Sequence, residues 1–286
     1  MLQITSKTYD SFRIYTDENV DNNSKTISMP IITLTSDLGL TDHYVASIKG
    51  KIFSKCNNVQ IVDVSHNIQP YNIGHAAFVL RNCYAYFPAN TIHLICVNNE
   101  GLRDVNYLLA KHQSQYFLAA DNGVFSILFD GMADKTFELI FKEKKSEIAF
   151  AFLDTIVPAA CALANGGSVD SIARPVSSIR QMHSVKPSIG EDYIRANVLY
   201  IDHFENVILN VTKQQFEKAR QGRNFYISFR RNEVIDRISN GYSNTVEGEK
   251  LCLFNSSGYL EIAINHGKAS SLLGLNEGES VKIEFK

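Results

Sequence analysis

The sequence predicts an α/β protein with two domains: a mostly parallel sheet sandwiched by helices, followed by a small antiparallel β-barrel-like domain. Apolar strand-like runs alternate with helically spaced runs in the first half, which favours parallel pairing. Short strand-like runs separated by turns fill the last third. The length of 286 residues also exceeds what one small core usually needs. We expect an N-terminal arm or tail at 1–28, an α/β domain at 29–170, a linker at 171–192 and a small β domain at 193–286.

The elements follow from hydrophobic spacing and turn residues. In the helix expected at 42–56, Val45, Ile48 and Ile52 recur at helical spacing, and 31–36 is a wholly apolar or small-residue run typical of a buried strand. The expected strands of the first domain are 31–36, 59–66, 90–97, 106–110 and 115–120, and its further helices are 72–87 and a segment beginning near 121. The expected strands of the second domain are 195–202, 206–211, 224–229, 250–255, 259–265 and 280–285, with one helix at 212–220.

The composition is that of an ordinary soluble protein. It is 45% hydrophobic and 20% charged, and the formal net charge of −2 gives no strong field for nucleic acid or an anionic membrane. We find no apolar run long enough to span a bilayer and no signal peptide. The five cysteines form no C-x-x-C pair and are typical of buried thiols in a reducing compartment, so we expect a cytoplasmic protein.

Common cofactor and metal motifs are missing from the sequence. No G-x-G-x-x-G follows the first strand, and no Walker loop, H-E-x-x-H or G-x-S-x-G occurs. The eight histidines show no metal-ligand spacing, so we expect neither a metal nor a bound cofactor.

Polar residues instead follow the expected parallel strands. Asp37 ends the first strand and Asp42 begins the next helix, while Asn98 follows the third strand. The carboxyl ends of parallel strands share one edge, where ligands bind. A carboxylate there can accept both hydroxyls of a ribose, although it can equally cap a turn, and spacing alone leaves these two readings of Asp37 and Asp42 level. For Asp121-Asn122-Gly123 we favour the turn.

Two turns of the second domain are candidate binding loops. Asp202, Phe204 and Asn206 lie in a tight connection between strands, and Ser256 precedes a glycine turn. Phe204 is an aromatic residue in a polar turn, which suits stacking on a flat base. The alternative is a hairpin whose phenylalanine anchors the loop by packing down.

Taken together, these segments resemble the S-adenosylmethionine hydrolases (SAM hydroxide adenosyltransferases), which are related to the fluorinating and chlorinating enzymes. The resemblance runs from about Thr33 to the C-terminus, outside residues 1–28. It rests on the segments TSDLGLTDHYVASIKGKI, IVDVSHNIQPYNIGHAAFVLRNCYAYFPANTIHLICV, ADNGVFS, YIDHFENVILN and NSSGYLEIAIN.

The resemblance implies a homotrimer with the site between the α/β domain of one subunit and the β domain of the next. It implies that Asp37 holds the ribose hydroxyls and that Asp42 lies beside the site. By the same likeness Phe204 and Asn206 face the adenosine. Asp202 and Ser256 face the amino-acid end of the methionine moiety.

This chain departs from the family at the water-holding positions. The hydrolases carry Phe-His-Gly-Arg-Asp where this chain has Phe150–Asp154, so their histidine corresponds to Ala151. They carry Asp-Pro-Gly where it has Asn98-Asn99-Glu100, and Arg103 is a poor match to their second arginine. We expect Asp154 to be structural and to cap the following helix, with Ala151 and Phe152 lining the pocket wall.

The resemblance therefore implies two candidate functions. The first is cleavage of S-adenosylmethionine (SAM) at ribose C5′ by water, giving adenosine and methionine, with SAM as substrate and not as a resident cofactor. The second is a protein that binds SAM or adenosine with weak or lost catalysis. A structural trimer without a ligand is disfavoured, because the ribose-side carboxylates and the Phe204 turn are retained. We favour the enzyme.

Overall fold

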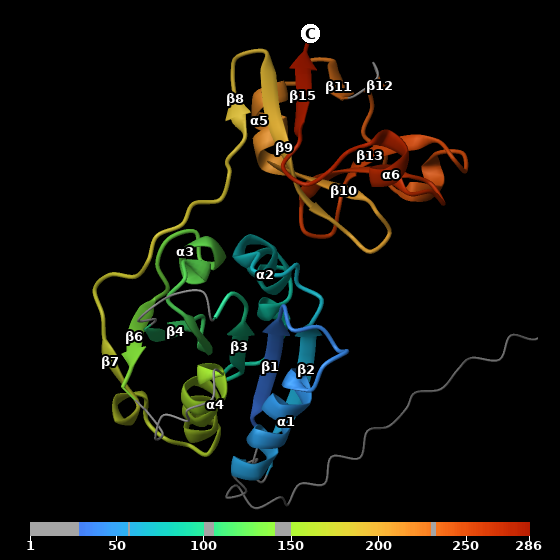
Figure 1. Ribbon diagram of the computed structural model, residues 1–286. Helices are drawn as coiled ribbons and strands as arrows, with labels where there is room; N and C mark the ends of the chain where they lie inside the picture. The colour runs from blue at the N-terminus through green and yellow to red at the C-terminus, as the bar shows by residue number, and fades with distance from the viewer. Residues whose placement is uncertain (1–28, 57, 100–105, 141–149, 230–232) are drawn as a thin grey trace, which may run out of the picture.

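The computed structural model describes residues 29–56, 58–99, 106–140, 150–229 and 233–286. These residues form two sheets, each with its own core (Figure 1). The expected fold class, a mostly parallel sheet between helices followed by a barrel-like antiparallel domain, is confirmed.

The first sheet has the strand order β2-β1-β3-β5-β4-β6-β7, in which β2, β1, β3 and β5 are parallel. The remaining pairs, β5–β4, β4–β6 and β6–β7, are antiparallel. For β4 and β5 the reason is their short connection, which consists of Gln113 and Ser114 alone. Both have positive φ (46° and 62°), as a two-residue hairpin turn requires. The strands are β1 (Ile31–Ser36), β2 (Gln60–Ser65), β3 (Ile92–Cys96), β4 (Tyr107–His112), β5 (Gln115–Ala120), β6 (Lys135–Leu139) and β7 (Ala173–Pro175).

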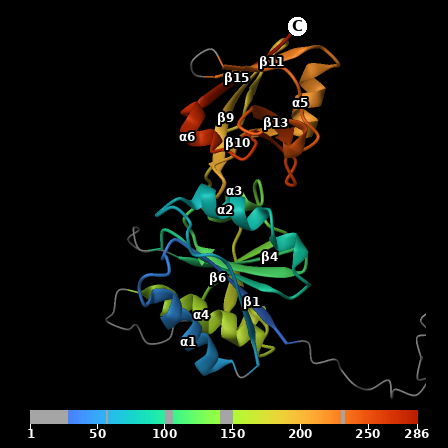
Figure 2. The same cartoon turned by 90° about the vertical axis from the view of Figure 1, so that its right-hand side faces the viewer.

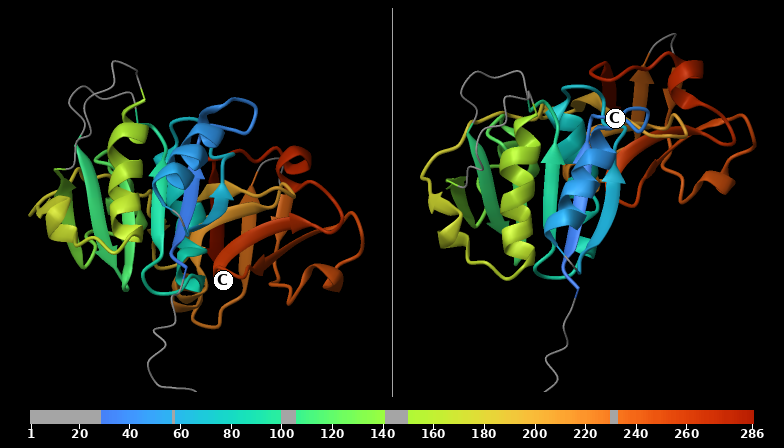
Figure 3. Two further views of the ribbon diagram at one scale, coloured as in Figure 1. Left: turned by 90° about the horizontal axis from the view of Figure 1, so that it is seen from below. Right: turned by 60° about the horizontal axis from the view of Figure 1, so that its bottom comes forward.

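Helices cover both faces of this sheet. One face packs against α1 (Tyr44–Lys55) and α4 (Ala151–Ala164), and the other against α2 (Ile73–Arg81) and α3 (Val124–Leu128). Figure 2 shows α2 and α3 on the side of the β domain and α1 and α4 on the far side. The view from below in Figure 3 shows α1 and α4 side by side over the sheet. Two 3-10 turns, η1 (Tyr84–Tyr86) and η2 (Val169–Ser171), complete the domain.

The start of α4 corrects two expectations. Its N-cap is Phe150, which supplies no side-chain cap, so Asp154 does not cap the helix. Asp154 instead lies in the first turn and accepts a charged hydrogen bond from Lys51 Nζ, 2.9 Å from its Oδ1. Phe152 does not line a pocket wall: it is 1% exposed and belongs to the core, because the helix turns that face onto the sheet. Ala151 is exposed.

The second sheet is antiparallel and nearly closed, with the order β12-β11-β15-β9-β10-β14-β13 and β8 paired to β9. The segment expected as a linker contains β7 and β8, so its two ends are bound to the two sheets. The strands are β8 (Ser188–Ile189), β9 (Tyr193–Ile201), β10 (Val207–Thr212), β11 (Phe225–Phe229), β12 (Glu233–Ile235), β13 (Lys250–Phe254), β14 (Tyr259–Ile264) and β15 (Ser280–Phe285). The helical segments are α5 (Lys213–Arg220), α6 (Ala269–Leu273) and η4 (Tyr242–Asn244).

The two domains touch through α2 and the barrel. The Tyr200 ring of β9 lies 4.8 Å from the ring of Phe78 and 4.9 Å from that of His75, centroid to centroid. This aromatic contact places α2 beside the strands that carry the candidate binding loops of the second domain. No helix among the described residues is long and apolar enough to cross a membrane.

Candidate functional site

Asp37 gathers the loops at the carboxyl edge of the parallel strands. Its Oδ2 accepts hydrogen bonds from the backbone N–H groups of Tyr71, at 2.9 Å, and Asn98, at 3.2 Å. Tyr71 and Asn98 both have left-handed backbones (φ 66° and 51°), which turn their N–H groups toward the carboxylate. Asp37 is half-buried, and its Oδ1 makes no hydrogen bond within the described residues. Oδ2 therefore fixes the loops, and Oδ1 is left without a hydrogen bond to the part of the chain that the structure describes.

A buried polar chain supports Asp37 from below. Ser36 Oγ lies 2.7 Å from His66 Nδ1, and both side chains are almost fully buried. His66 Nε2 approaches Asp63 Oδ1 to 3.1 Å without hydrogen-bond alignment. The His66 carbonyl accepts the N–H of Gly39 at 2.8 Å. These hydrogen bonds join the loop after β1 to the loop after β2, so His66 has a structural role here.

The predicted water-holding positions are only partly assembled. Asn98 is tied to Asp37 through its backbone, whereas Ala151 offers only a methyl group at the first turn of α4. Asp42 is exposed just before α1. Arg103 and Glu100 lie outside the described residues.

Asp121 holds the chain that leaves the first domain. Its Oδ1 accepts the backbone N–H of Arg180 at 2.8 Å, and its own N–H donates to the Asn106 carbonyl. The neighbouring Asn122 side chain donates to the Val97 carbonyl at 2.9 Å. These contacts agree with the turn interpretation of Asp121.

The β9–β10 loop is built around the Asp202 carboxylate. Its Oδ1 accepts the N–H groups of Phe204 and Asn206, at 2.9 and 2.8 Å, and its Oδ2 accepts the Asn206 side-chain amide at 3.0 Å. Asn206 is buried, but the Phe204 ring is 71% exposed. Asp202 is thus the loop's anchor, and Phe204 is presented to solvent as a flat apolar surface.

Two hollows meet at this loop. The first, about 680 Å³, is lined by Phe204, Asn206, His266 and Lys268; we call it the base cavity. The second, about 510 Å³, is lined by Ser256, Glu261, Tyr200 and, from α2, Phe78; we call it the tail cavity. Asp202 and Tyr242 line both cavities, so the two are adjacent.

Glu261 and Tyr242 line the tail cavity, and the sequence analysis did not name either as a candidate. The Tyr242 hydroxyl donates to Glu261 Oε1 at 2.7 Å, and Glu261 is only 3% exposed. Burial, with a contribution from the Asp202 charge, raises the pKa of Glu261 above its ordinary value. The available signal was a single carboxylate inside the apolar strand YLEIAI.

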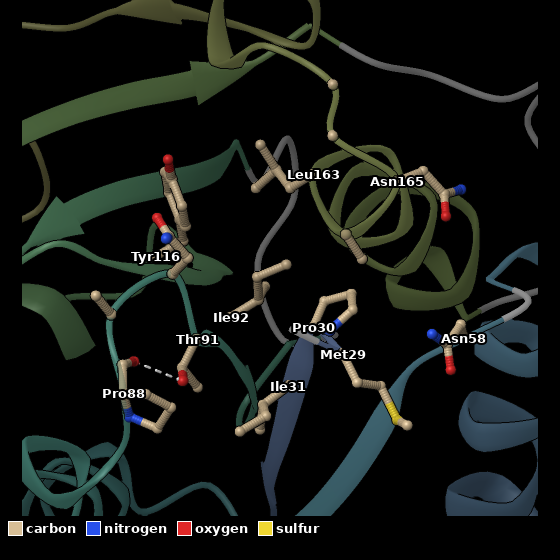
Figure 4. A pocket seen from close by; sticks show the side chains of 15 residues that line it. Met29, Pro30, Ile31, Asn58, Pro88, Thr91, Ile92, Tyr116, Leu163 and Asn165 are labelled. Carbon is tan, nitrogen blue, oxygen red and sulfur yellow. Dashed lines mark hydrogen bonds between the residues drawn. The ribbon is translucent and has the colours of Figure 1, made fainter. Parts of the chain in front are cut away.

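A third hollow, about 690 Å³, lies at the opposite edge of the first sheet, among the amino ends of β1 and β3 (Figure 4). Pro30, Ile31, Ile92 and Leu163 make it largely apolar, and Tyr116 is its one titratable side chain among the described residues. Ligands of parallel sheets bind at the carboxyl edge. We therefore assign the site to Asp37 and the two barrel cavities. Among the described residues, no three His, Cys, Asp or Glu side chains are grouped to hold a metal ion.

Fold and site define a two-domain protein with a carboxylate at the edge of a parallel sheet and an aromatic-walled pocket on a barrel. The sequence matches the models of the SAM hydroxide adenosyltransferase N-terminal domain, over residues 32–173, and C-terminal domain, over residues 196–282. The chain belongs to this family.

The matches to curated relatives cover nearly the full length of those relatives. An (R)-S-adenosyl-L-methionine hydrolase from Methanocaldococcus jannaschii is 28% identical, covering 90% of this chain and 97% of the relative. A fluorinase from Actinopolyspora mzabensis is 24% identical, covering 91% and 99%. Among solved structures, an uncharacterised conserved protein from Thermotoga maritima superposes with a TM-score of 0.79 at 26% identity, covering 88% of this chain and 99% of that one.

Proposed function

We propose that this protein is a SAM hydrolase that cleaves the substrate at ribose C5′ with water, giving adenosine and methionine. The observation that carries the proposal is the Phe204 ring, held exposed by the Asp202-anchored loop beside a hollow large enough for a nucleoside base. Relatives named SAM hydrolase match almost the whole chain, which supports the same reaction class.

The ligand would bind in three parts. Adenine stacks on Phe204 beside Asn206, and the amino-acid end enters the tail cavity beside Ser256, with Asp202 between the two. Asp37 Oδ1, which has no hydrogen-bond partner in the described ranges, accepts the ribose hydroxyls, with Asp42 nearby.

Both barrel cavities contain Asp202, whereas the contacts of Asp37 come from its own sheet edge. We therefore propose a homotrimer in which the sheet edge of one subunit completes the barrel site of the next. We also propose that the protein acts in the cytoplasm, because its five cysteines are free thiols, as is usual in a reducing compartment.

The chemistry needs little from the protein beyond positioning. Water attacks C5′, the C5′–S bond breaks, and its electron pair stays on sulfur as the neutral thioether of methionine, so the leaving group needs no acid. The attacking water loses a proton to solvent. Holding water and sulfonium in line in a site shielded from bulk solvent supplies the acceleration.

A SAM- or adenosine-binding protein with weak or lost catalysis is the second candidate. It is favoured by Asn98 and Ala151, which offer neither a carboxylate nor an imidazole where the family hydrolases hold water. Without such a group the attacking water is poorly oriented, and hydrolysis slows by orders of magnitude.

One experiment separates the two candidates. The protein is incubated with SAM, adenosine and methionine are followed by chromatography, and SAM binding is titrated in parallel by calorimetry. Product formation above the no-protein rate supports the hydrolase. Binding without product supports the second candidate, and no binding contradicts both. The proposed assembly is tested by light scattering, in which a monomer at ligand-binding concentrations would contradict the trimer.

A further inference from the structure

We infer that the tail cavity recognises the ligand's ammonium group and not its carboxylate, so that the protein also accepts adenosyl sulfoniums whose sulfur-linked chain ends in an ammonium alone. This inference rests on the proposed function, because it assumes that the adenosine lies on Phe204. It names a substrate class wider than SAM: decarboxylated adenosyl sulfoniums with a primary amine.

The charges around the tail cavity are of one sign. Asp202 and Glu261 contribute two carboxylates, and no lysine, arginine or histidine is among the described residues that line it. Asp202 is satisfied by its own loop, since its two oxygens accept three N–H groups. Glu261 is 3% exposed, and its two side-chain hydrogen-bond partners, the Tyr242 hydroxyl and the Asn255 amide, are both neutral.

A buried carboxylate without a cation is unfavourable, and a ligand ammonium relieves it. The negative charge of Asp202 also affects the pKa of neighbouring groups. The pKa of Glu261 and that of the Tyr200 hydroxyl are raised, in each case mainly by burial and in part by the charge of Asp202. A ligand carboxylate in the same space would face this field without a described cationic partner.

The lysine near the site lies at the other end. Lys268 lines the base cavity, and it is already paired with Glu205, at 2.9 Å. It stands where the uncharged adenine would bind. The distribution therefore directs a cationic tail toward Glu261.

Hydrolysis of the decarboxylated substrate balances in the same way as that of SAM. Water forms the new C5′–O bond, the C5′–S bond breaks toward sulfur, and one proton is released. The products are adenosine and a methylthio-alkylamine. No oxidant, reductant or further reactant enters.

The test is a ligand series titrated by calorimetry against the full chain: SAM, decarboxylated SAM, deaminated SAM and methylthioadenosine. We expect decarboxylated SAM to bind at least as tightly as SAM, and deaminated SAM to bind about tenfold more weakly or worse. In Glu261→Gln the two ligands with an aliphatic ammonium, SAM and decarboxylated SAM, should lose about tenfold in affinity, while methylthioadenosine, which lacks that ammonium, should be unchanged. Glu217→Gln makes the same chemical change on the exposed face of α5 and should alter nothing.

Several outcomes overturn the inference. Deaminated SAM binding as tightly as SAM would do so, as would equal losses for all ligands in Glu261→Gln. If Glu261→Gln does not fold, the ligand series on the parent still decides, and Tyr242→Phe, which keeps the carboxylate, should preserve the preference for amines. Failure of methylthioadenosine to bind at all would instead contradict the proposed function, so the two failures are distinguishable.

Discussion

Asp37 Oδ2 accepts a hydrogen bond from the backbone N–H of Asn98 at 3.2 Å. Asp37 is the residue proposed to bind the ribose, and Asn98 occupies the position at which the resemblance places an aspartate of the family hydrolases. The same oxygen accepts the Tyr71 N–H, so one carboxylate orients two loops of the sheet edge. Asp37 Oδ2 therefore fixes the loops, whereas the proposed contact with a ligand falls to Oδ1.

The first prediction separates these roles with two substitutions of Asp37. Asp37→Ala should weaken binding of the adenosine moiety by roughly 3–6 kcal/mol, the scale of two charge-assisted hydrogen bonds, and should also lower the melting temperature. Asp37→Asn keeps an acceptor for the two N–H groups and should leave the melting temperature nearly unchanged while still weakening binding. Calorimetry and thermal denaturation measure both. An Asp37→Ala protein that folds and binds SAM like the parent would refute the ribose assignment.

The second prediction concerns Asp121, which serves as a matched control at the same sheet edge. Asp121→Ala leaves the Arg180 N–H without its acceptor and should cost about 1 kcal/mol of stability. Binding of SAM should be unaffected, because the carboxylate is occupied by the departing chain. A loss of SAM affinity comparable to that of Asp37→Ala, at unchanged stability, would assign Asp121 to the site.

The third prediction is a pH dependence of stability from His93. His93 is fully buried between Thr33 and Gln115: its Nδ1 is 2.7 Å from Thr33 Oγ1 and its Nε2 is 3.0 Å from Gln115 Oε1. Burial lowers the pKa of His93 from 6.5 to about 4. Between these values the unfolded chain binds a proton that the native state does not, so stability rises with pH.

The contribution of His93 is fully present above pH 6.5 and is lost as the pH falls toward 4. The gap between the two pKa values, at about 1.4 kcal/mol per pH unit, amounts to about 3 kcal/mol. Urea unfolding at several pH values measures it. His93→Gln removes the titrating group and should flatten this part of the profile even though it lowers stability at neutral pH. An unchanged slope in His93→Gln would assign the acid sensitivity elsewhere.

The fold could be predicted largely because its signals are local. The run ending at Asp37 and the helical spacing of Val45, Ile48 and Ile52 each specify one element, and the structure contains both. Antiparallel pairing at the edge of the first sheet was not anticipated, since it depends on the two left-handed residues Gln113 and Ser114.

The candidate site was predictable only in part. Turn residues such as Phe204 and Ser256 indicate a binding loop in the sequence. Glu261 lies in the middle of a strand, and it becomes a candidate only because segments distant in the sequence bury its carboxylate beside a cavity. The sequence predicts that Ala151 and Phe152 both line a pocket, but Ala151 is exposed and Phe152 is buried in the core. The packing of α4 on the sheet decides which of these two adjacent residues faces the core. Burial that depends on packing between distant segments cannot be predicted from a short window of sequence.

The fourth prediction restores the family's side chains through Asn98→Asp, Ala151→His and Leu153→Arg together. Asn98 has a left-handed backbone (φ 51°), which aspartate tolerates, and Ala151 is exposed, so neither change displaces core atoms. Leu153 packs partly against the core, so an arginine there must extend its guanidinium outward along α4. We expect SAM hydrolysis to rise tenfold or more, because a carboxylate and an imidazole can orient and polarise the attacking water.

A separate substitution tests the interpretation of Asp154, which pairs with Lys51 across the α1–α4 contact. Asp154→Asn should cost stability without removing activity, since the lost contact is an ion pair between two helices. The rate of adenosine release under saturating SAM, measured beside SAM affinity for the parent, the triple variant and Leu153→Arg alone, separates chemistry from folding damage. A triple variant that binds SAM like the parent but hydrolyses it no faster would mean that these positions do not hold the water in this chain. Rapid hydrolysis by the parent, abolished in a folded Asp154→Asn, would make Asp154 part of the reaction.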